Sequence, residues 1–246
     1  MNKDIIFGIQ PVIEAILSGK EIDKLIIQKN AGIDSTRELF SHIKTHKIPF
    51  QKVPVEKLNK ITRKNHQGVI AFVSSVDFAS LDSIVNEAFS KGKDPLILIL
   101  DRVTDIRNFG AIVRTAECTG VDAIVIPARG SAALNADAMK TSAGALNYVP
   151  VCRSPYLIDD INYLKNSGLT LIGMTEKTDK GLYDLQISGP VALIMGSEED
   201  GISPEYLKAC DYLAKIPILG EIGSLNVSVA AGVALYEITR QRLKTD

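Results

Sequence analysis

Polar and charged residues that could act on a substrate gather in three short segments of the second part of the chain. Asn108 and Arg114 belong to the first segment, and Glu198 stands in the second. Ser224 and Asn226 belong to the third. Amide and hydroxyl groups can orient a substrate, and a guanidinium can hold a phosphate through two parallel contacts. These residue types predict a site that positions a polar substrate.

Histidine is absent from these segments. His42, His46 and His66 all lie within residues 1–75, and residues 76–246 contain none. Chemistry in the larger part therefore has no local imidazole base, which disfavours Ser-His-Asp and Cys-His catalysis. The chain also lacks a Walker A motif and a GxGxxG turn, so a P-loop NTPase and a nicotinamide dehydrogenase are disfavoured too.

Two of the segments also have a purely structural interpretation. Asn108 can be the N-cap of the helix that follows it, and Arg114 can pair with Glu117 one turn later. The candidate N-caps of the last helix are Ser224, Asn226 and Ser228. Spacing alone leaves these interpretations open beside the functional ones.

The middle segment combines glycine with negative charge. Gly196 and Gly201 flank Glu198, Glu199 and Asp200. Glycine permits a tight loop with exposed backbone groups, and the carboxylates suit a cationic or neutral ligand better than a nucleotide phosphate. The alternative is a solvated acidic turn.

The surrounding sequence alternates between buried strands and helices. Continuous apolar runs, typical of strands covered on both faces, span residues 96–100, 123–126, 169–174 and 191–195, with a weaker run at 212–218. Helical patterns lie near residues 108–119, 136–146, 158–167 and 204–209, and a last helix reaches about residue 243. This alternation predicts an α/β fold with a mostly parallel sheet and helices on both faces. Ligands bind such sheets at the carboxyl ends of the strands, which is where the three segments fall.

The first part of the chain reads as a separate small α/β domain over residues 1–75, followed by a linker at 76–94 and a larger domain at 95–246. Its predicted elements are a helix at 9–18, a strand at 24–28, a helix at 35–45 and a strand at 69–73. Residues 1–75 carry 12 Lys and Arg against 7 Asp and Glu, a balance of +5 in a chain whose net charge is −1. This asymmetry suggests a polyanionic partner, although charge that merely aids solubility is the alternative.

Composition excludes several classes of protein. With 246 residues, 46% hydrophobic and 23% charged, the chain has the balance of an ordinary globular protein. No apolar run could span a bilayer, and the first residues lack a stretch of signal-peptide length. Cys118, Cys152 and Cys210 are widely spaced and form no zinc motif, so no metal is expected. We therefore expect a cytoplasmic location.

In combination, the three segments resemble the signature motifs of the SpoU/TrmH (SPOUT) family of RNA ribose 2′-O-methyltransferases, which use S-adenosylmethionine. The matching residues are 108–116, 195–201 and 224–230, within a resemblance that covers about residues 95–243. The first part, through residues 7–16 and 66–69, resembles the leading RNA-binding domain of the RlmB branch. That domain has the fold of certain small ribosomal proteins, and RlmB enzymes methylate a guanosine of large-subunit (23S) ribosomal RNA.

The resemblance implies a deep trefoil knot, a homodimer and a set of site residues. By matched position, the catalytic and substrate-side residues are Asn108, Arg114, Glu198, Ser224 and Asn226. The cofactor-binding residues are Met174, Thr175, Gly196, Ile216 and Leu225. The resemblance leaves two roles open for Arg114, a base for the 2′-hydroxyl or a group that holds it in line, and two places of action, its own site or that of the partner subunit.

Three other functions stay open. A transfer-RNA 2′-O-methyltransferase of the same family would keep the chemistry and change the substrate. A non-catalytic RNA-binding protein would have a vestigial pocket, and an unrelated α/β enzyme would use a nucleotide. The chain departs from the family pattern at residues 106–107, where many relatives have proline, and at residues 199–200, where basic residues or glycine are common. These departures affect the shape and charge of the loops.

Overall fold

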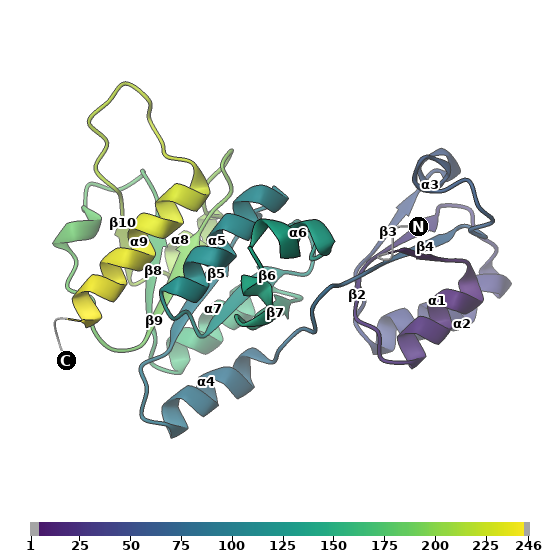
Figure 1. Ribbon diagram of the computed structural model, residues 1–246, viewed down its shortest axis with the longest axis horizontal. Helices are drawn as coiled ribbons and strands as arrows, with labels where there is room; N and C mark the ends of the chain where they lie inside the picture. The colour runs from purple at the N-terminus through teal and green to yellow at the C-terminus, as the bar shows by residue number, and fades with distance from the viewer. Residues whose placement is uncertain (1–4, 244–246) are drawn as a thin grey trace. The chain divides into compact units, whose positions relative to one another are not determined.

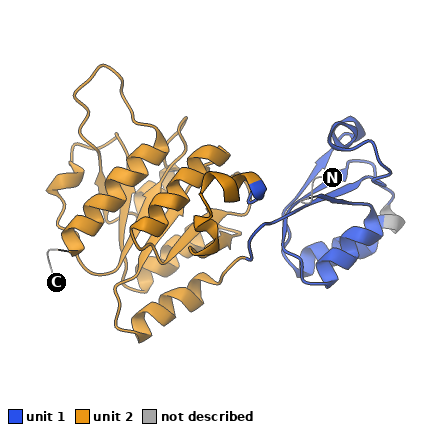
Figure 2. Cartoon of the chain, viewed as in Figure 1, with its two compact units in different colours: residues 1–77, 133–136 blue, residues 78–132, 137–246 orange. Residues whose placement is uncertain are grey.

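The computed structural model describes residues 5–243, apart from the side chains of residues 33–35, and divides into two compact units (Figure 2). Unit 1 comprises Met1–Asp77 with Ala133–Ala136, and unit 2 comprises Phe78–Ala132 with Asp137–Asp246. No helix of the described part of the chain is both long and apolar enough to cross a membrane.

Unit 2 is built on a six-stranded parallel sheet, which confirms the predicted fold class. Its strands are β5 (Leu96–Leu100), β6 (Ala123–Pro127), β7 (Val151–Ser154), β8 (Thr170–Met174), β9 (Val191–Met195) and β10 (Tyr212–Ala214). Its helices are α4 (Leu81–Ser90), α5 (Ile106–Cys118), α6 (Ala136–Thr141), α7 (Leu157–Asn166), α8 (Pro204–Ala209) and α9 (Val227–Arg242), with short 3-10 turns at Ala145–Asn147 and Leu182–Asp184.

The strand order is β10-β8-β9-β5-β6-β7. The chain therefore builds outward from β5 through β6 and β7, then returns to add β8, β9 and β10 on the other side. Strands β5 and β9 pair at the centre, from Leu96 opposite Val191 to Leu100 opposite Met195. The strand order reverses at this pair, and a ligand site is expected beyond its carboxyl ends. The trefoil knot stays a prediction.

Every residue of β5 and β9 is buried, because helices cover the sheet on both faces. On one face, a core cluster joins alternate residues of the strands to α4 and α7, with Val85, Ile97, Ile99, Ile161 and Ile194 at its centre. Helices α5 and α9 pack against each other and lie side by side in Figure 1. Ala231 and Ala234 of α9 are fully buried.

Helix α9 runs back along the sheet and is anchored at its far end. The guanidinium of Arg242 donates to the carbonyls of Asp94 at 3.1 Å, Pro95 at 3.3 Å and Gly189 at 2.9 Å. Pro95 directly precedes β5, and Gly189 stands just before β9. The last turn of α9 is therefore bonded to the amino ends of both central strands.

In unit 2, one predicted helix has the wrong end and one strand was not predicted. The helix predicted over residues 136–146 ends at Thr141, because Ala143 and Gly144 adopt positive φ angles of 51° and 85°. Strand β7 was missed, since its sequence includes Arg153 and Ser154 and is not a continuous apolar run. It pairs in parallel with β6 at the edge of the sheet.

Unit 1 is a four-stranded mixed sheet with strand order β1-β4-β2-β3. Its elements are β1 (Ile5–Phe7), α1 (Ile9–Leu17), β2 (Ile22–Gln28), α2 (Ile33–Thr45), β3 (Phe50–Val53), α3 (Val55–Ile61) and β4 (Val69–Val73). Helices α1 and α2 share one apolar core with the sheet, and Leu58 of α3 packs with Ile26 and Ile70 in a second core. The predicted helices and two of the strands are present, while β1, β3 and α3 were not predicted.

Most of residues 76–94, predicted to be a linker, instead belongs to unit 2. Ser80 is the N-cap of α4 and accepts from the Ser83 N–H. Val85 is fully buried in the unit 2 core, and Ala88 is buried on the same helix. An amphipathic helix that buries apolar residues has a fixed place in the fold, so the segment is a structural element of the larger unit.

Gly110 of α5 provides a test of this packing. A Cβ added there would lie 2.2 Å from Thr141 Oγ1 and 2.8 Å from the carbonyl carbon of Thr141 in α6. Since backbone cannot move aside cheaply, Gly110→Ala should lower the free energy of unfolding by about 1–3 kcal/mol. The same change at Gly220, where the added Cβ meets no atom within 4 Å, should stay within about 0.5 kcal/mol. Urea unfolding measures both, and equal stability of the two variants would contradict the tight α5–α6 contact.

Candidate active site

A cavity of about 360 Å³ opens at the carboxyl ends of β8 and β9 and beside the segment that follows β10. In Figure 1 the loop from β10 to α9, which forms one wall, projects at the top of the view. All five predicted cofactor-binding residues line it, namely Met174, Thr175, Gly196, Ile216 and Leu225. Glu198 and Ser224, predicted on the substrate side, line the same cavity. The structure thus brings together segments that are far apart in the sequence.

Met174 and Thr175 are placed by the edge of the sheet. Both are buried where β8 ends, and the Thr175 N–H donates to the carbonyl of Ala214 in β10 at 2.9 Å. The Thr175 hydroxyl accepts from the Lys177 N–H at 3.2 Å, which turns the chain away from the sheet. The floor of the cavity is therefore fixed by strand pairing.

Gly196 is required by close backbone packing. It directly follows β9, and a Cβ added there would lie 2.1 Å from the carbonyl carbon of Gly201 and 2.2 Å from the nitrogen of Ile202. Ser197 and Gly201 also exchange backbone hydrogen bonds of 3.2 and 3.0 Å. Residues 196–201 consequently form a closed loop against the cavity, as the two glycines predicted.

The charge around the cavity is mostly negative. Glu176, Glu198 and Glu199 line it, opposed by Lys215. Such a lining favours a cationic ligand over a phosphate-rich one. Within residues 5–243, no group of three or more His, Cys, Asp or Glu side chains is placed to hold a metal ion.

A second cavity of about 320 Å³ adjoins the first. The two share the same wall, made by Ser197, Glu198, Glu199 and Val227. The rest of the second cavity is lined by the loop after β5, the start of α5 and two residues from other loops. These residues are Arg102, Val103, Thr104, Asp105, Asn108, Gly130 and Asp200. A group bound in one cavity would therefore lie next to a group bound in the other.

Asn226 links the residues of the shared wall. Its Nδ2 donates to Asn108 Oδ1 at 3.0 Å and to Glu198 Oε1 at 2.5 Å. Its Oδ1 accepts from the backbone N–H of Ser228 at 3.0 Å, so Asn226 is also the N-cap of α9. The Val227 N–H donates to Glu198 at 3.5 Å. Asn226, Asn108 and Glu198, predicted site residues from three segments, thus meet at one amide and are called the Asn226 group below.

Asn108 does not cap its helix. The N-cap of α5 is Asp105, whose Oδ1 accepts from the N–H groups of Arg107 at 2.8 Å and Asn108 at 2.9 Å. The hydrogen bond from the Asn108 N–H, together with that from Arg107, lowers the pKa of the Asp105 carboxyl. Because Asp105 caps the helix, the Asn108 side chain is available to Asn226.

Arg114 lies apart from this group. It is exposed on α5, lines neither of the two cavities, and has no ion pair with Glu117. Among the described residues its guanidinium has no hydrogen-bond or ion-pair partner. Ser224 is also exposed, in the loop that lines the first cavity. A single chain therefore does not bring Arg114 to the Asn226 group.

Asp101 and Arg102, which the sequence motifs did not single out, join the two central loops. Asp101 is buried and accepts from the Ser203 N–H at 2.7 Å, while Arg102 reaches Asp200 at 2.8 Å. Hydrogen bonding to Asp101 and Asp200 raises the pKa of Arg102. The signal was present, because two charged residues stand at the carboxyl end of an entirely apolar strand.

Comparison with protein-family models finds two matches. Residues 95–236 match the SpoU rRNA Methylase family. Residues 5–79 match the model described as RNA 2′-O ribose methyltransferase substrate binding. The first match lies within unit 2, apart from Ala133–Ala136, which belong to unit 1. The second match covers unit 1 from residue 5 to Asp77 and the first two residues of unit 2.

Similar proteins have related descriptions. A putative TrmH family tRNA/rRNA methyltransferase of Staphylococcus saprophyticus is 35% identical over 98% of this chain and 97% of its own length. The SpoU methyltransferase AviRb from Streptomyces viridochromogenes, solved in complex with the cofactor AdoMet, superposes with a TM-score of 0.61 at 26% identity, covering 98% of this chain and 90% of that one. The TrmH/SpoU tRNA modifying enzyme of A. aeolicus has a TM-score of 0.58 at 28% identity, over 66% of this chain and 86% of that one.

The family match spans most of unit 2 and contains both cavities and the Asn226 group. The match to the staphylococcal relative extends over nearly the whole chain. The chain therefore belongs to the SpoU rRNA Methylase family.

Proposed function

We propose that this protein transfers a methyl group from S-adenosylmethionine to a ribose 2′-hydroxyl of RNA, and that the acceptor is a guanosine of large-subunit (23S) ribosomal RNA. The observation that carries the proposal is the Asn226 group, which lies where two adjoining cavities share a wall. Methyl transfer needs a donor and an acceptor side by side, and two cavities separated by one wall of side chains suit this requirement.

The first cavity fits the cofactor. S-adenosylmethionine supplies an electrophilic methyl group on a positively charged sulfur, and carboxylates near the cavity favour that charge. Met174, Thr175, Gly196, Ile216 and Leu225 would hold it. The backbone of the closed loop after β9 and of the loop before α9 provides polar groups, while Met174 and Leu225 provide apolar contact.

The second cavity fits the acceptor nucleotide. Asn108 and Glu198 line it, and the Asn226 amide fixes both side chains. An oriented carboxylate and an oriented amide can accept from and donate to ribose hydroxyl groups. Ser224, which lines the first cavity, would contact the cofactor or the RNA. A non-catalytic RNA-binding protein would have no need of side chains fixed between two adjoining cavities.

Arg114 would act from the other subunit of a homodimer. On α5 it is exposed, and the neighbouring helix α9 presents Val229 and Tyr236, which are 51% and 55% exposed. A guanidinium offers only donors, arranged in one plane, so holding the hydroxyl and a phosphate in line is the role we assign. Packing of α5 and α9 against their symmetry mates would bring it to the partner's Asn226 group.

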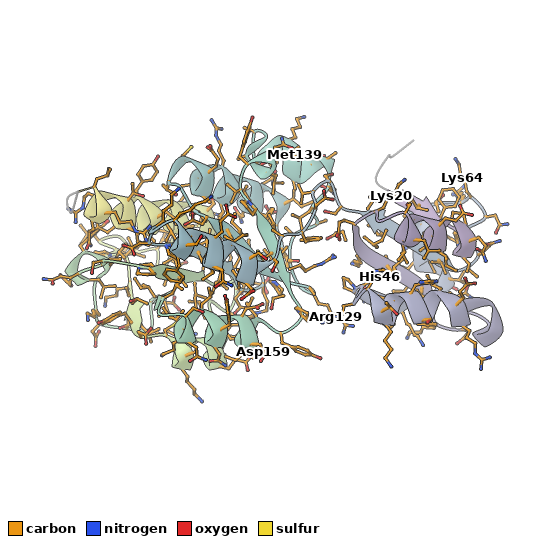
Figure 3. All side chains as sticks on the ribbon, turned by 90° about the horizontal axis from the view of Figure 1, so that it is seen from below. Lys20, His46, Lys64, Arg129, Met139 and Asp159 are labelled. Carbon is orange, nitrogen blue, oxygen red and sulfur yellow. The ribbon has the colours of Figure 1, made fainter. Side chains whose placement is uncertain are left out.

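Unit 1 would bind the RNA outside the reacting nucleotide. Its segment 1–75 carries a net charge of +5, and the exposed side chains of Lys20 and Lys64 project from its surface (Figure 3). The resemblance of this segment to the RlmB branch favours ribosomal RNA. The tRNA/rRNA description of the staphylococcal relative makes transfer RNA the second candidate. A cytoplasmic location also remains a prediction.

The first experiment is methyl transfer from radiolabelled S-adenosylmethionine to unmodified total RNA, with ribosomal and transfer RNA separated afterwards. We expect label in the large ribosomal RNA, and nuclease mapping should locate it in one 2′-O-methylguanosine. Label in transfer RNA would support the proposed reaction and contradict the proposed substrate. Absence of label in naked RNA and in ribosomal precursor particles, together with absent cofactor binding, would contradict the enzymatic function.

Asn226→Asp separates the cap of α9 from the link between site residues. Aspartate keeps the acceptor for the Ser228 N–H but loses the donor to Asn108 and repels Glu198. Methyl transfer should fall on the order of 10²-fold, because displaced groups no longer align the acceptor. Thermal unfolding should shift by no more than about 4 °C.

The matched control is Asn166→Asp, the same change at an exposed position at the end of α7. It should leave both methyl transfer and thermal unfolding as in the wild type. Full activity of Asn226→Asp would show that the amide is not needed to align the site.

A mixed dimer tests whether Arg114 acts across subunits. Arg114→Ala and Asn226→Ala chains, each inactive alone, should form a heterodimer with one intact site and about half of the wild-type activity. Two affinity tags allow the heterodimer to be purified before the assay. An inactive heterodimer, with both variant chains folded and binding cofactor, would place Arg114 and Asn226 in the same subunit's site.

A further inference from the structure

We propose that Arg102 is a positioning residue for methyl transfer, a guanidinium clamp that holds the loop carrying Glu198 in its working place. The inference rests on the proposed function, because it assigns Arg102 to the same pair of cavities. Family motifs and residue types drew attention to Asn108, Glu198 and Asn226, and none of them points to Arg102.

The contacts of Arg102 span the two central loops. Its Nε donates to Asp101 Oδ1 at 3.0 Å, one terminal nitrogen donates to Asp200 Oδ2 at 2.8 Å, and the other donates to the Gly201 carbonyl at 3.0 Å. Only a guanidinium offers several donors in one rigid plane, so one side chain can bind three groups at once. The carboxyl end of β5 is thereby bonded to the far side of the loop after β9.

Asp101 makes this clamp rigid. Its side chain is 3% exposed, and its Oδ2 accepts from the backbone N–H of Ser203 at 2.7 Å. Its own N–H donates to the carbonyl of Met195 at 2.8 Å. The loop after β9 is thus bonded to residue 101 at both of its ends and to Arg102 in between. A buried carboxylate with fixed partners gives the guanidinium a firm anchor.

The backbone of Arg102 is in an unfavourable conformation. Its φ is 59°, in the left-handed region that favours glycine, and it is not in a helix or strand. Strain of this kind persists where surrounding contacts hold it, and it clusters at functional sites. Here the contacts of the guanidinium are those that hold it, so the side chain has a use that outweighs the backbone cost.

Glu198 is the residue that the clamp would position. It lies two residues before Asp200 in the same closed loop, where the Asp200 N–H also donates to the Ser197 hydroxyl at 3.1 Å. Its carboxylate accepts from Asn226 on the opposite side. The loop is therefore held between Arg102 and Asn226, with Glu198 facing both cavities. Loosening the Arg102 side would move Glu198 away from the acceptor while the cofactor floor, formed by Met174 and Thr175, stays in place.

The test variant is Arg102→Gly, which removes the clamp and relieves the backbone strain. We expect hydrogen–deuterium exchange of residues 196–203 to rise about tenfold while exchange of the central strands stays unchanged. On the RNA that the wild type methylates, kcat should fall at least about tenfold. The Kd of S-adenosylmethionine, from calorimetry, should rise by a smaller factor than kcat falls, because Met174 and Thr175 stay in place although the loop after β9 also lines the cavity. Because relief of the backbone strain offsets part of the loss of the Asp101 ion pair, the midpoint of thermal unfolding should fall by less than about 8 °C.

Two further variants sharpen the result. Arg102→Lys keeps the charge but cannot bind three groups in one plane, so it should show the same loss of kcat. Ala143→Gly is the matched control, because Ala143 is another residue at positive φ, 51°, and it lines neither cavity. It should leave exchange of residues 196–203 and kcat unchanged.

Unchanged loop exchange or unchanged kcat in Arg102→Gly would overturn the clamp, as would full activity of Arg102→Lys. A parallel loss of stability, cofactor binding and kcat would also overturn it, since that pattern belongs to a merely structural residue. If the wild type methylates no RNA, the proposed function fails, while the exchange measurement still decides whether Arg102 holds the loop.

Discussion

The parallel pairing of β5 with β9 is the constraint on which the site depends. These strands are separated by most of unit 2 in the sequence, and their pairing places the loops after Leu100 and Met195 at the same edge of the sheet. Asn108 follows one strand and Glu198 follows the other. Every residue of both strands is buried, so apolar burial supplies the stability while the polar chemistry is confined to the ends. Shifting one strand against the other would separate the two residues.

At that edge, the side-chain amide of Asn226 has both a structural role and a role in the site. Asn226 begins α9 and at the same time bonds Asn108 and Glu198. Helix α9, which Asn226 begins, packs against α5, the helix that carries Asn108. The position of the site therefore depends on helix packing as well as on strand pairing. Residues of the Asn226 group are held by contacts from three segments that are distant in the sequence.

Sequence patterns predicted the elements better than their ends and contacts. The central strands were confirmed because five successive apolar residues can only be buried. Strand β7 and the true end of α6 depend on pairing with β6 and on backbone angles at Ala143, which periodicity does not record. Motif spacing singled out Asn108, but it could not tell a helix cap from a partner of Asn226, because Asp105 competes for the cap. The link from Arg102 to Asp200 likewise spans most of the unit and has no local signature.

Helix α9 joins the two ends of the central strand pair. Its first residue is capped at the carboxyl edge, and Arg242 in its last turn holds the carbonyls of Pro95 and Gly189 at the opposite edge. The length of the helix, about 24 Å for its 16 residues, therefore sets the separation of its two anchored ends. Each added or deleted residue would rotate one anchor by about 100° relative to the other. Natural variation in this helix should therefore be confined to substitutions, with changes of length collecting in the loops.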